Sequence, residues 1–573
     1  MFFPYKRGLT STSCFFMYLK IKAYTIIFGV LLFPVVFASA DTLGQNQYFF
    51  VEKSFEKNDK AQVSATLQLI SNNGYFYIAD DWYQGLSGEK KDQVDFGLHS
   101  LANDFDTIIY PNLTSLYGSE WKPGIDNDVK VSILFHQMRN GATGYFRTQD
   151  EFEKAQAADS NAREMIFLNV EILPYSLSSE YLAHEFVHLI TFNQKDRLQG
   201  VEEETWLNEA RAEYAPTLLG FDEPYQGSYL EQRMKRFVES PRDSITQWDG
   251  RESDYGALDS FFHYFIERYG DIILSDSLKS PLVGIASLNN SLKKYSFNKT
   301  FSQIFTNWTQ AMFLNDCSFG PDFCFRQTNL SDIKIAPSLI LLPTGQETTM
   351  DLTYSIAPWS GNWYRIMGGA DTLSLTFQGS KGDIYKIPYV ICSQNNICSL
   401  GELFLDANNK ANVSFTGFNK NFQSLTLMPS LQISKEIKSF SLSLKSELSA
   451  GEQEKINQLL AQIAQLKKQI AEIQAKLAVL QNKTPQQDIS LTSCSFAFES
   501  NLGLGSRSQN VSCLQKFLVS QGPDIYPQAA ISGFYGILTK QAVIKFQEKY
   551  SISPASGFVG PLTRAQIKKI MSF

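Results

Sequence analysis

The spacing of apolar residues changes along the chain and marks regions of different predicted structure. Apolar runs at residues 129–135 (VKVSILF) and 164–170 (EMIFLNV) predict strands, and stretches of helical periodicity lie between and after them. Residues 41–335 are therefore expected to form an α+β domain. From 336 to 435 apolar and polar residues alternate, as at 373–377, with glycine, asparagine and serine between the runs. This alternation predicts a small β-sandwich.

Residues 450–483 contain an unbroken heptad pattern, which predicts a coiled-coil spacer. The apolar residues at one seam position are Ile456, Ile463, Ile470 and Leu477, and those at the other are Leu459, Leu466, Ile473 and Leu480. Mostly isoleucine at the first position and leucine at the second favours a parallel homodimer. The alternative is a single helix that packs against a neighbouring domain, since the flanking positions offer no opposite charges to specify a partner.

The C-terminal residues 490–573 contain an internal repeat, GFYGILT at 533–539 and GFVGPLT at 557–563. Each copy predicts a tight glycine turn followed by a threonine that caps a helix. Together with 511–515 (VSCLQ) and 542–547 (AVIKFQ), the repeats resemble the small α-helical peptidoglycan-binding module of bacterial wall enzymes. The resemblance implies peptidoglycan as a partner, and a helical cap without a ligand is the alternative.

Composition places the chain among globular multidomain proteins. Its 573 residues are 43% hydrophobic, 13% aromatic and 19% charged, which is enough apolar surface for several cores. The formal net charge of −7 argues against nucleic acid as a partner. Residues 488–573 differ from the rest, because they contain eight lysines and arginines and only four acidic residues, a balance that suits an anionic wall polymer.

The N-terminus predicts a signal peptide over residues 1–40. An uncharged apolar run at 23–38 follows Lys20 and Lys22 and ends in Ala-Ser-Ala at 38–40, a small-x-small cleavage pattern. The run is shorter than the roughly 20 residues that span a bilayer, which disfavours the alternative of a membrane anchor. We expect a secreted protein, and the start of translation is left open between Met1 and Met17.

Cleavage would remove Cys14 and leave six cysteines, which points to an oxidising exterior. They form three sequence-local couples, Cys317 with Cys324, Cys392 with Cys398, and Cys494 with Cys513. Local pairing is the simplest of 15 connectivities. A metal site made of these cysteines would need CxxC-like spacing, which the sequence lacks.

Residues 184–188 (HEFVH) carry the clearest chemical signal. On a helix, His184 and His188 lie one turn apart on the same face, as two ligands of one metal require, and Glu185 stands beside them. The chain has only five histidines, so a chance match to this pattern is improbable. Two satisfied core histidines would be the alternative interpretation.

A hydrolytic zinc site takes three protein ligands, so a third is expected downstream. Glu209, in WLNEARAEY at 206–214, follows His188 by 21 positions, enough for one helix to end near 192–194 and a second to cross beneath the metal. A third histidine six residues after His188 is excluded, because that position is Gln194. Glu213, one turn after Glu209, is either an acceptor for a ligand histidine or a solvated charge.

HExxH followed by WLNEARAEY resembles the gluzincin metallopeptidases, and the YLAHEFVH start with its later NE motif looks most like the hyicolysin-like secreted bacterial group. The resemblance implies a zincin-type catalytic domain with Zn²⁺ at His184, His188 and Glu209 and with Glu185 as the base. Tyr255 matches in rough position a tyrosine that stabilises the oxyanion in aminopeptidase-type members, although a packing tyrosine is the alternative.

These features predict a secreted, cell-wall-associated bacterial zinc metalloendopeptidase that hydrolyses peptide bonds in proteins. The segment 140–146 (NGATGYF) is either an edge to which an extended peptide adds or a surface turn. A peptidoglycan cross-link endopeptidase is one alternative, since a wall module concentrates the enzyme on the wall without choosing its bond. A non-catalytic wall-attached adhesin or spacer is another.

Overall fold

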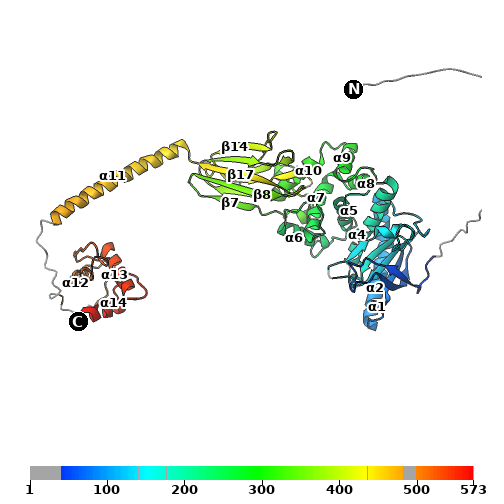
Figure 1. The fold of residues 1–573 in the computed structure, drawn as a ribbon, viewed down its shortest axis with the longest axis horizontal. Helices are drawn as coiled ribbons and strands as arrows, with labels where there is room; N and C mark the ends of the chain where they lie inside the picture. Colours follow the sequence, from blue (N-terminus) through cyan, green and yellow to red (C-terminus); the bar gives the residue numbers. More distant parts are fainter. Residues whose placement is uncertain are drawn as a thin grey trace, which may run out of the picture. The chain divides into compact units, whose positions relative to one another are not determined.

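The computed structural model describes residues 40–139, 141–173, 175, 177–434, 436–481, 494 and 499–571. The predicted signal peptide, with Cys14 and Met17, lies outside these residues except for its last position. The chain divides into two compact units, Met1–Glu452 and Gln453–Phe573 (Figure 1). Within the described ranges, none of the helices combines the length and apolarity needed to cross a membrane.

The first unit begins with a six-stranded sheet in the order β1-β2-β3-β4-β6-β5. Its strands are β1 (Asn46–Phe50), β2 (Gln62–Ile70), β3 (Gly74–Ala79), β4 (Val131–His136), β5 (Gly144–Phe146) and β6 (Met165–Asn169). The central strands β3, β4 and β6 run parallel, and all their residues are buried. The sequences of such strands are continuous apolar runs, because both faces of the sheet are covered by other parts of the protein. The runs at 129–135 and 164–170 correspond to β4 and β6.

Helices cover one face of this sheet, and a smaller apolar cluster covers the other. The covering segments are α2 (Gly88–Asp104), η1 (Phe105–Ile109), α3 (Tyr110–Tyr117) and α4 (Leu177–Thr191). Short turns of helix complete this region, namely α1 (Asp80–Tyr83), η2 (Thr148–Glu151) and η3 (Val170–Ile172). At the sheet's edge, β5 pairs only with β6 among the described strands.

Seven further helical segments follow α4 and lie between this sheet and the later strands (Figure 1). They are η4 (Phe192–Arg197), α5 (Thr205–Leu218), α6 (Tyr229–Glu239), α7 (Glu252–Tyr269), α8 (Ile272–Leu278), α9 (Gly284–Lys294) and α10 (Phe301–Leu314). The expected end of the HEFVH helix near 192–194 is wrong, because the chain stays helical through η4. Buried polar side chains fix this extra turn: the amides of Asn193 and Gln194 each donate to the Ser119 carbonyl at 2.8 Å.

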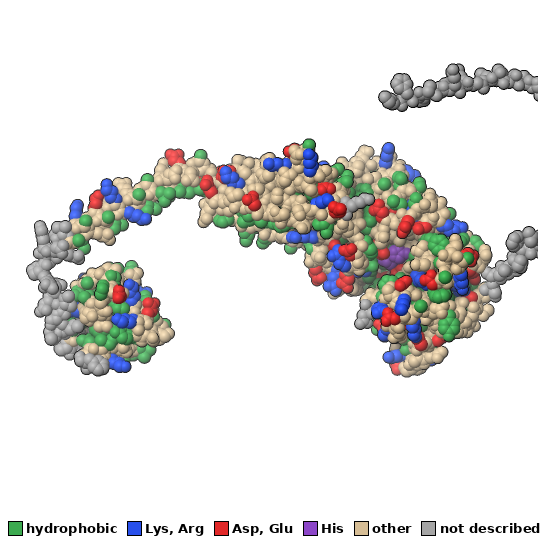
Figure 2. Space-filling view, in the orientation of Figure 1, with side chains coloured by type: hydrophobic (Ala, Val, Ile, Leu, Met, Phe, Trp, Pro, Cys, Tyr) green, Lys and Arg blue, Asp and Glu red, His purple; other side chains and the backbone are tan. Residues whose placement is uncertain are grey.

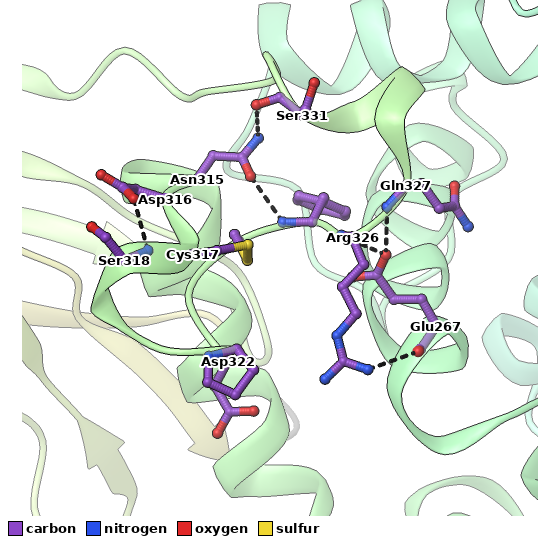
Figure 3. Close-up of a disulfide and its surroundings, with 12 residues drawn as sticks. Glu267, Asn315, Asp316, Cys317, Ser318, Asp322, Arg326, Gln327 and Ser331 are labelled. Carbon is purple, nitrogen blue, oxygen red and sulfur yellow. Dashed lines mark hydrogen bonds between the residues drawn. A yellow bond between two sulfur atoms is a disulfide. The ribbon is translucent and has the colours of Figure 1, made fainter.

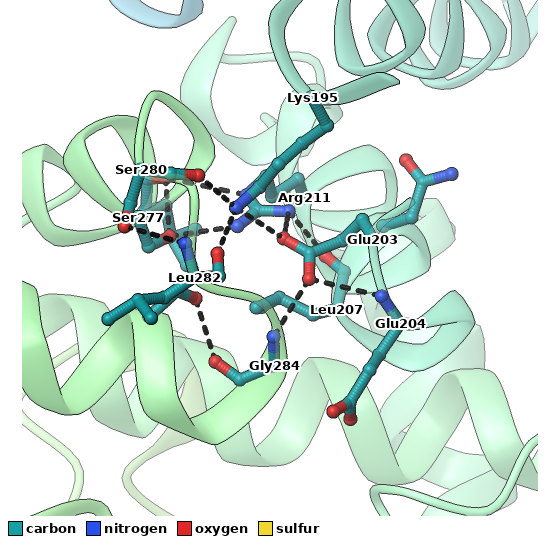
Figure 4. A network of polar contacts seen from close by, with 12 residues as sticks. Lys195, Glu203, Glu204, Leu207, Arg211, Ser277, Ser280, Leu282 and Gly284 are labelled. Carbon is teal, nitrogen blue, oxygen red and sulfur yellow. Dashed lines mark hydrogen bonds and ion pairs between the residues drawn. The ribbon is translucent and has the colours of Figure 1, made fainter. Parts of the chain in front are cut away.

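A buried ion-pair network ties η4 and α5 to the α8–α9 connection (Figure 4). Glu203 Oε2 lies 2.8 Å from Arg211 Nη1 and 3.5 Å from Lys195 Nζ, and its other oxygen accepts from the Gly284 amide at 2.8 Å. Lys195 also donates to the carbonyl of Ser280 at 2.8 Å. Since every charged member is paired, the network holds α5 in a single position without an uncompensated buried charge.

A disulfide closes the loop that follows α10 (Figure 3). Cys317 is the first residue of η5 (Cys317–Phe319). It is bonded to Cys324, which lies before η6 (Thr328–Leu330). The amide of Asn315 donates to the Leu330, Ser331 and Ile333 carbonyls, and its oxygen accepts from Phe325 N. Cys392–Cys398 and Cys494–Cys513 are also disulfides, so all three predicted couples are confirmed.

Two antiparallel-rich sheets follow and share one apolar core. One has the order β14-β10-β17-β8 and the other β13-β12-β15-β9-β7, with a small β11-β16 pair. The strands are β7 (Ser338–Leu342), β8 (Thr348–Ile356), β9 (Tyr364–Gly368), β10 (Thr372–Gln378), β11 (Ile384–Lys386), β12 (Pro388–Ser393), β13 (Cys398–Glu402), β14 (Lys410–Thr416), β15 (Phe422–Leu427), β16 (Ser430–Ile433) and β17 (Lys438–Glu447). The last strand, β17, lies beyond the predicted boundary at 435, because its alternating Phe440, Leu442 and Leu444 fill this core.

The second unit contains all but the first turn of α11 (Ala450–Gln481) and three shorter helices, α12 (Gln509–Ser520), α13 (Ile537–Lys549) and α14 (Pro561–Met571). The heptad residues form one continuous helix, as predicted. The prediction that threonines cap these helices is wrong, because Thr539 and Thr563 lie inside α13 and α14. Their buried hydroxyls instead accept hydrogen bonds from Gln515 at 2.9 Å and Gln547 at 2.8 Å, which satisfies two buried amides.

Candidate metal centre

The helix α4 of the first unit carries His184, Glu185 and His188. From Leu182 to Thr191 every residue of α4 is buried, because its apolar side chains pack on the sheet and on α3. Phe186, between the two histidines in sequence, stacks on Tyr110 with a centroid distance of 5.4 Å. The two histidines and Glu185 are thus held on a rigid element.

The crossing of α4 and α5 brings Glu209 to the two histidines. His184 Nε2 and His188 Nε2 lie 3.2 Å apart, and Glu209 Oε2 lies 3.4 Å from the first and 3.7 Å from the second. Ligand atoms at roughly 2.1 Å from a tetrahedral metal are about 3.4 Å from one another. The three atoms therefore have the mutual spacing of ligands of one ion, and the three residues could hold a metal ion.

Hydrogen-bond chemistry shows that these three atoms fit a cation. His188 Nδ1 lies 3.1 Å from Asn208 Oδ1, and His184 Nδ1 lies 3.1 Å from Glu213 Oε1. Since both partners are acceptors, a proton on each Nδ1 would be favoured, and each Nε2 could then present a lone pair to a metal. Glu209 Oε2 is buried and has no hydrogen-bond donor among the described residues. Three potential ligand atoms thus converge, an arrangement that a metal ion satisfies.

The sequence left Glu213 open between an acceptor for a histidine and a solvated charge. The residue is buried beside His184, which fits an acceptor and excludes a solvated charge. Besides its contact with His184, it accepts from Tyr229 Oη at 3.0 Å and pairs with Arg233 Nε at 3.1 Å. Burial acts to raise the pKa of Glu213, but Arg233 and His184 outweigh it and hold the pKa below its usual value. Sequence reasoning missed Tyr229 and Arg233, which come from α6 and belong to no local motif.

Glu185 faces the edge strand β5. A Cβ at Gly144 would lie 2.9 Å from both Cγ and Oε1 of Glu185, so any larger residue at position 144 would displace that carboxylate. Burial raises the pKa of Glu185 to about 8, partly opposed by His184. The carboxyl group is therefore held beside the three convergent atoms in an environment that favours proton exchange near neutral pH.

Tyr255 also lies at this site. It belongs to the first turn of α7, where Asp254 accepts from the backbone amides of Asp249 and Arg251 at 2.9 Å each. Its ring centroid is 6.5 Å from that of His184 and 4.6 Å from that of Trp248. Burial raises its pKa, so the hydroxyl remains a proton donor at neutral pH.

These residues open into a cleft of about 1000 Å³. Its walls come from the 141–148 segment with β5, from α4 and α5, and from α6 and the start of α7. Histidine side chains are visible from outside at one place on the first unit (Figure 2). The cleft has both polar and apolar lining, so polar groups that can orient a ligand stand among apolar side chains.

Comparisons with known proteins inform mainly the C-terminal unit. Residues 507–567 match the model of the family described as "Putative peptidoglycan binding domain". This match supports peptidoglycan binding and association with the cell wall. The comparison with curated proteins gives no match.

Similar solved structures are remote. The pre-peptidase C-terminal domain of a Bacillus anthracis collagenase is 11% identical over 19% of this chain and 97% of its own, with a TM-score of 0.15. The lysozyme inhibitor PliG of Aeromonas hydrophila is 12% identical over 20% of this chain and 100% of its own, with a TM-score of 0.14. The IMPa metallopeptidase, in complex with T-antigen, is 11% identical over 70% of this chain and 52% of its own, with a TM-score of 0.12. At such TM-scores none of these likenesses carries an argument, and the family match at residues 507–567 is what the comparisons establish.

Proposed function

We propose that the protein is a secreted, cell-wall-associated zinc metalloendopeptidase of gluzincin type that hydrolyses peptide bonds in proteins. The observation that carries the proposal is the convergence of His184 Nε2, His188 Nε2 and Glu209 Oε2, with Glu185 beside them in an open cleft. The HExxH motif on a helix and a glutamate from the next helix are the His₂Glu ligand set of hydrolytic zinc sites.

The ligands in this proposal are His184, His188 and Glu209. A bound zinc ion would supply Lewis-acid polarisation of the scissile carbonyl and lower the pKa of a water molecule toward about 7. Glu185 takes the proton from the attacking water and passes it to the nitrogen of the leaving amine. The hydroxyl of Tyr255 donates a hydrogen bond to the carbonyl oxygen as negative charge develops there.

A protein substrate is favoured by β5, the last strand of its sheet, which pairs on one side only among the described strands. An extended peptide can add to this edge through backbone hydrogen bonds, and Gly144 keeps the space next to Glu185 open. The peptidoglycan cross-link is the second candidate substrate, supported by the match at residues 507–567. A non-catalytic adhesin or spacer is disfavoured, because it gives no reason for three convergent acceptors in a cleft.

The wall module and α11 define the partners in this proposal. The match at residues 507–567 supports peptidoglycan as the anchor, and the heptad face of α11 supports a parallel homodimer. Two modules joined in one dimer gain avidity for the wall without a new contact.

The decisive experiment compares Glu185→Gln with the wild-type protein. Glu185→Gln is expected to keep stoichiometric zinc while kcat/KM on a protein substrate falls by roughly 10² to 10⁴. Glu171→Gln, which changes an exposed glutamate in the same way, serves as the matched control. Zinc is quantified by atomic absorption. Proteolysis that survives Glu185→Gln, or that persists in the zinc-free protein, contradicts the proposal.

A further inference from the structure

A second pocket adjoins the cleft of the candidate metal centre. Its volume is about 530 Å³, and its lining includes Trp121, Ile125, Phe152 and Phe192. Thr148 lines both the pocket and the cleft, so the two spaces adjoin each other at this residue. Aromatic contacts also connect them. The ring centroid of Phe192 lies 6.1 Å from that of Phe146, which lines the cleft, and 6.0 Å from that of Phe152.

The backbone from β5 to η2 leads from the one space to the other. β5 starts at Gly144, beside Glu185, and ends at Phe146. Arg147 continues in extended conformation, with φ −119° and ψ 110°, before η2 begins at Thr148. At about 3.3 Å per residue, the steps from Gly144 to Thr148 span at most roughly 13 Å. An extended peptide beside β5 advances at the same rate, so a residue about three to five positions from Glu185 reaches the pocket.

A network of polar contacts fixes the wall that η2 contributes. Arg147 Nη2 lies 2.8 Å from Asp159 Oδ2, and its Nη1 lies 3.5 Å from Asp150 Oδ1. The carbonyl of Phe152 accepts from Ser160 Oγ at 2.6 Å. Phe152 is nevertheless 37% exposed. An apolar ring is thus presented on a fixed backbone, which lowers the ordering cost of binding a ligand there.

The inner lining of the pocket favours an apolar ligand over an ion. Phe192 is 8% exposed and Glu151 is 2% exposed. Burial raises the pKa of Glu151 well above its usual range, with Glu164 adding to the shift, which favours the neutral carboxyl group. Arg197 is exposed at the rim, where its guanidinium lies 4.0 Å from the centroid of the Trp121 ring. Buried neutral surface of this kind gains free energy by excluding water against an apolar group.

We infer that this pocket is a distal subsite, which takes a large apolar side chain of the same peptide whose scissile bond lies beside Glu185. The inference rests on the proposed function and adds a second point of recognition to it. A phenylalanine in the pocket would pack on Phe152 and Phe192. Full burial of such a side chain is worth roughly tenfold or more in affinity.

The distribution of cleavage sites tests the inference on the full chain. Products from a mixture of unfolded proteins are sequenced by mass spectrometry. We expect large apolar residues to be enriched about three to five positions to one side of the cleaved bonds. Phe152→Ala should lose this enrichment. Phe96→Ala, which removes a phenylalanine that is 78% exposed on α2, is the matched control and should keep it. The same enrichment in the wild-type and Phe152→Ala proteins overturns the proposal.

Peptide binding to Glu185→Gln separates the subsite from catalysis. The probes are fluorescein-labelled peptides of alanine and glycine in which one phenylalanine is moved along the sequence, and anisotropy gives Kd. The best position should bind roughly tenfold or more tightly than the others. Phe152→Ala in this background should abolish the difference, whereas Phe96→Ala and the conservative Phe152→Leu should retain it.

The outcomes distinguish the subsite from the proposed function. Binding that depends on the position of the phenylalanine, without cleavage by the wild-type protein, would contradict the peptidase and leave the subsite. Cleavage without such a dependence would contradict the subsite and leave the peptidase. Absence of peptide binding, or a position dependence that survives Phe152→Ala, also overturns the subsite.

Discussion

His184 Nδ1 lies 3.1 Å from Oε1 of Glu213, so the carboxylate one turn beyond Glu209 on α5 contacts the far side of the first histidine ring. Tyr229 and Arg233 fix this carboxylate in turn. A carboxylate at this position favours a proton on Nδ1, which would leave Nε2 free toward Glu209. We therefore expect Glu213 to act as a positioning residue; it does not itself belong to the group of three convergent atoms.

Glu213→Gln is expected to weaken zinc affinity by 10- to 100-fold, the usual effect of losing an acceptor behind a ligand histidine. The amide keeps the size of the side chain but not its charge. Affinity is measured by competition with a chromophoric chelator. Glu202→Gln, at an exposed site before α5, is the matched control. Unchanged zinc affinity in Glu213→Gln would show that the carboxylate does not position His184.

Tyr255→Phe should lower kcat with little change in KM, because the hydroxyl acts only on the charge that develops during reaction. We expect a decrease of roughly 10²-fold or more, by analogy with the loss of one oxyanion donor. The phenylalanine ring preserves the packing on Trp248 and Arg233. Steady-state kinetics on a peptide substrate measure both constants. A rise in KM at constant kcat would assign Tyr255 to substrate binding instead.

The three convergent acceptors were predictable because each follows from local sequence. Two histidines four positions apart on a helix share a face, and the need for a third ligand directed attention to Glu209. Arg233, Tyr229 and Gly144 could not be found in this way. Their roles arise from the packing of α6 and β5 against α4, and no short-range pattern marks such contacts.

Helix boundaries were predicted less well, for identifiable reasons. The start of α7 gave no sequence signal, because the N-cap Arg251 has no acceptor in its side chain and only Asp254 accepts there, from the Arg251 backbone amide at 2.9 Å. Thr539 and Thr563 have the spacing of caps, yet the need to satisfy buried Gln515 and Gln547 places them inside their helices. In both cases a tertiary or side-chain contact overrides the local preference.

Stability should depend on pH through Glu180. Burial, with a smaller effect of Asp222, raises the pKa of this α4 residue to about 8 from an ordinary value of 4.5. The folded state therefore holds the proton more tightly than the unfolded state. Its stabilising contribution is complete below pH 4.5 and is lost as the pH rises through about 8.

Glu180→Gln removes this titration and should be more stable than the wild type at pH 9. The expected gain in the free energy of unfolding is a few kcal/mol, because each unit of pKa difference corresponds to about 1.4 kcal/mol. The two proteins should have similar stability near pH 5. Urea unfolding at both pH values provides the comparison, with Glu202→Gln as the control. If the free energies of unfolding of the wild-type protein and Glu180→Gln change with pH in parallel, Glu180 is not the source of the pH dependence.

The seam of α11 should form a dimer in solution. Its apolar side chains from Ile456 to Leu477 are 36–59% exposed in the single chain, an unusual amount of unpaired apolar surface. Ile463→Asp with Ile470→Asp places two charges in the seam and should give a monomer. Ala464→Asp with Ala471→Asp adds the same charges one position away and should leave the dimer intact.

Light scattering after gel filtration measures the mass of each protein in solution. A monomeric wild-type protein, or a dimer in both double variants, refutes a coiled coil along this seam.

The C-terminal module should hold the protein on the wall. Residues 507–567 match the family described as a putative peptidoglycan binding domain, and residues 488–573 carry twice as many basic as acidic side chains. The Glu185→Gln chain, which avoids digestion, is expected to sediment with purified peptidoglycan, whereas the same chain truncated after Gln481 stays in solution. If the basic residues contribute, retention of the longer chain should decrease as salt shortens the range of electrostatic attraction. Chitin serves as an uncharged polysaccharide control. Equal retention of the two chains would locate the anchor outside the module, and strong retention on chitin would show that the peptide and charge of peptidoglycan are not what is recognised.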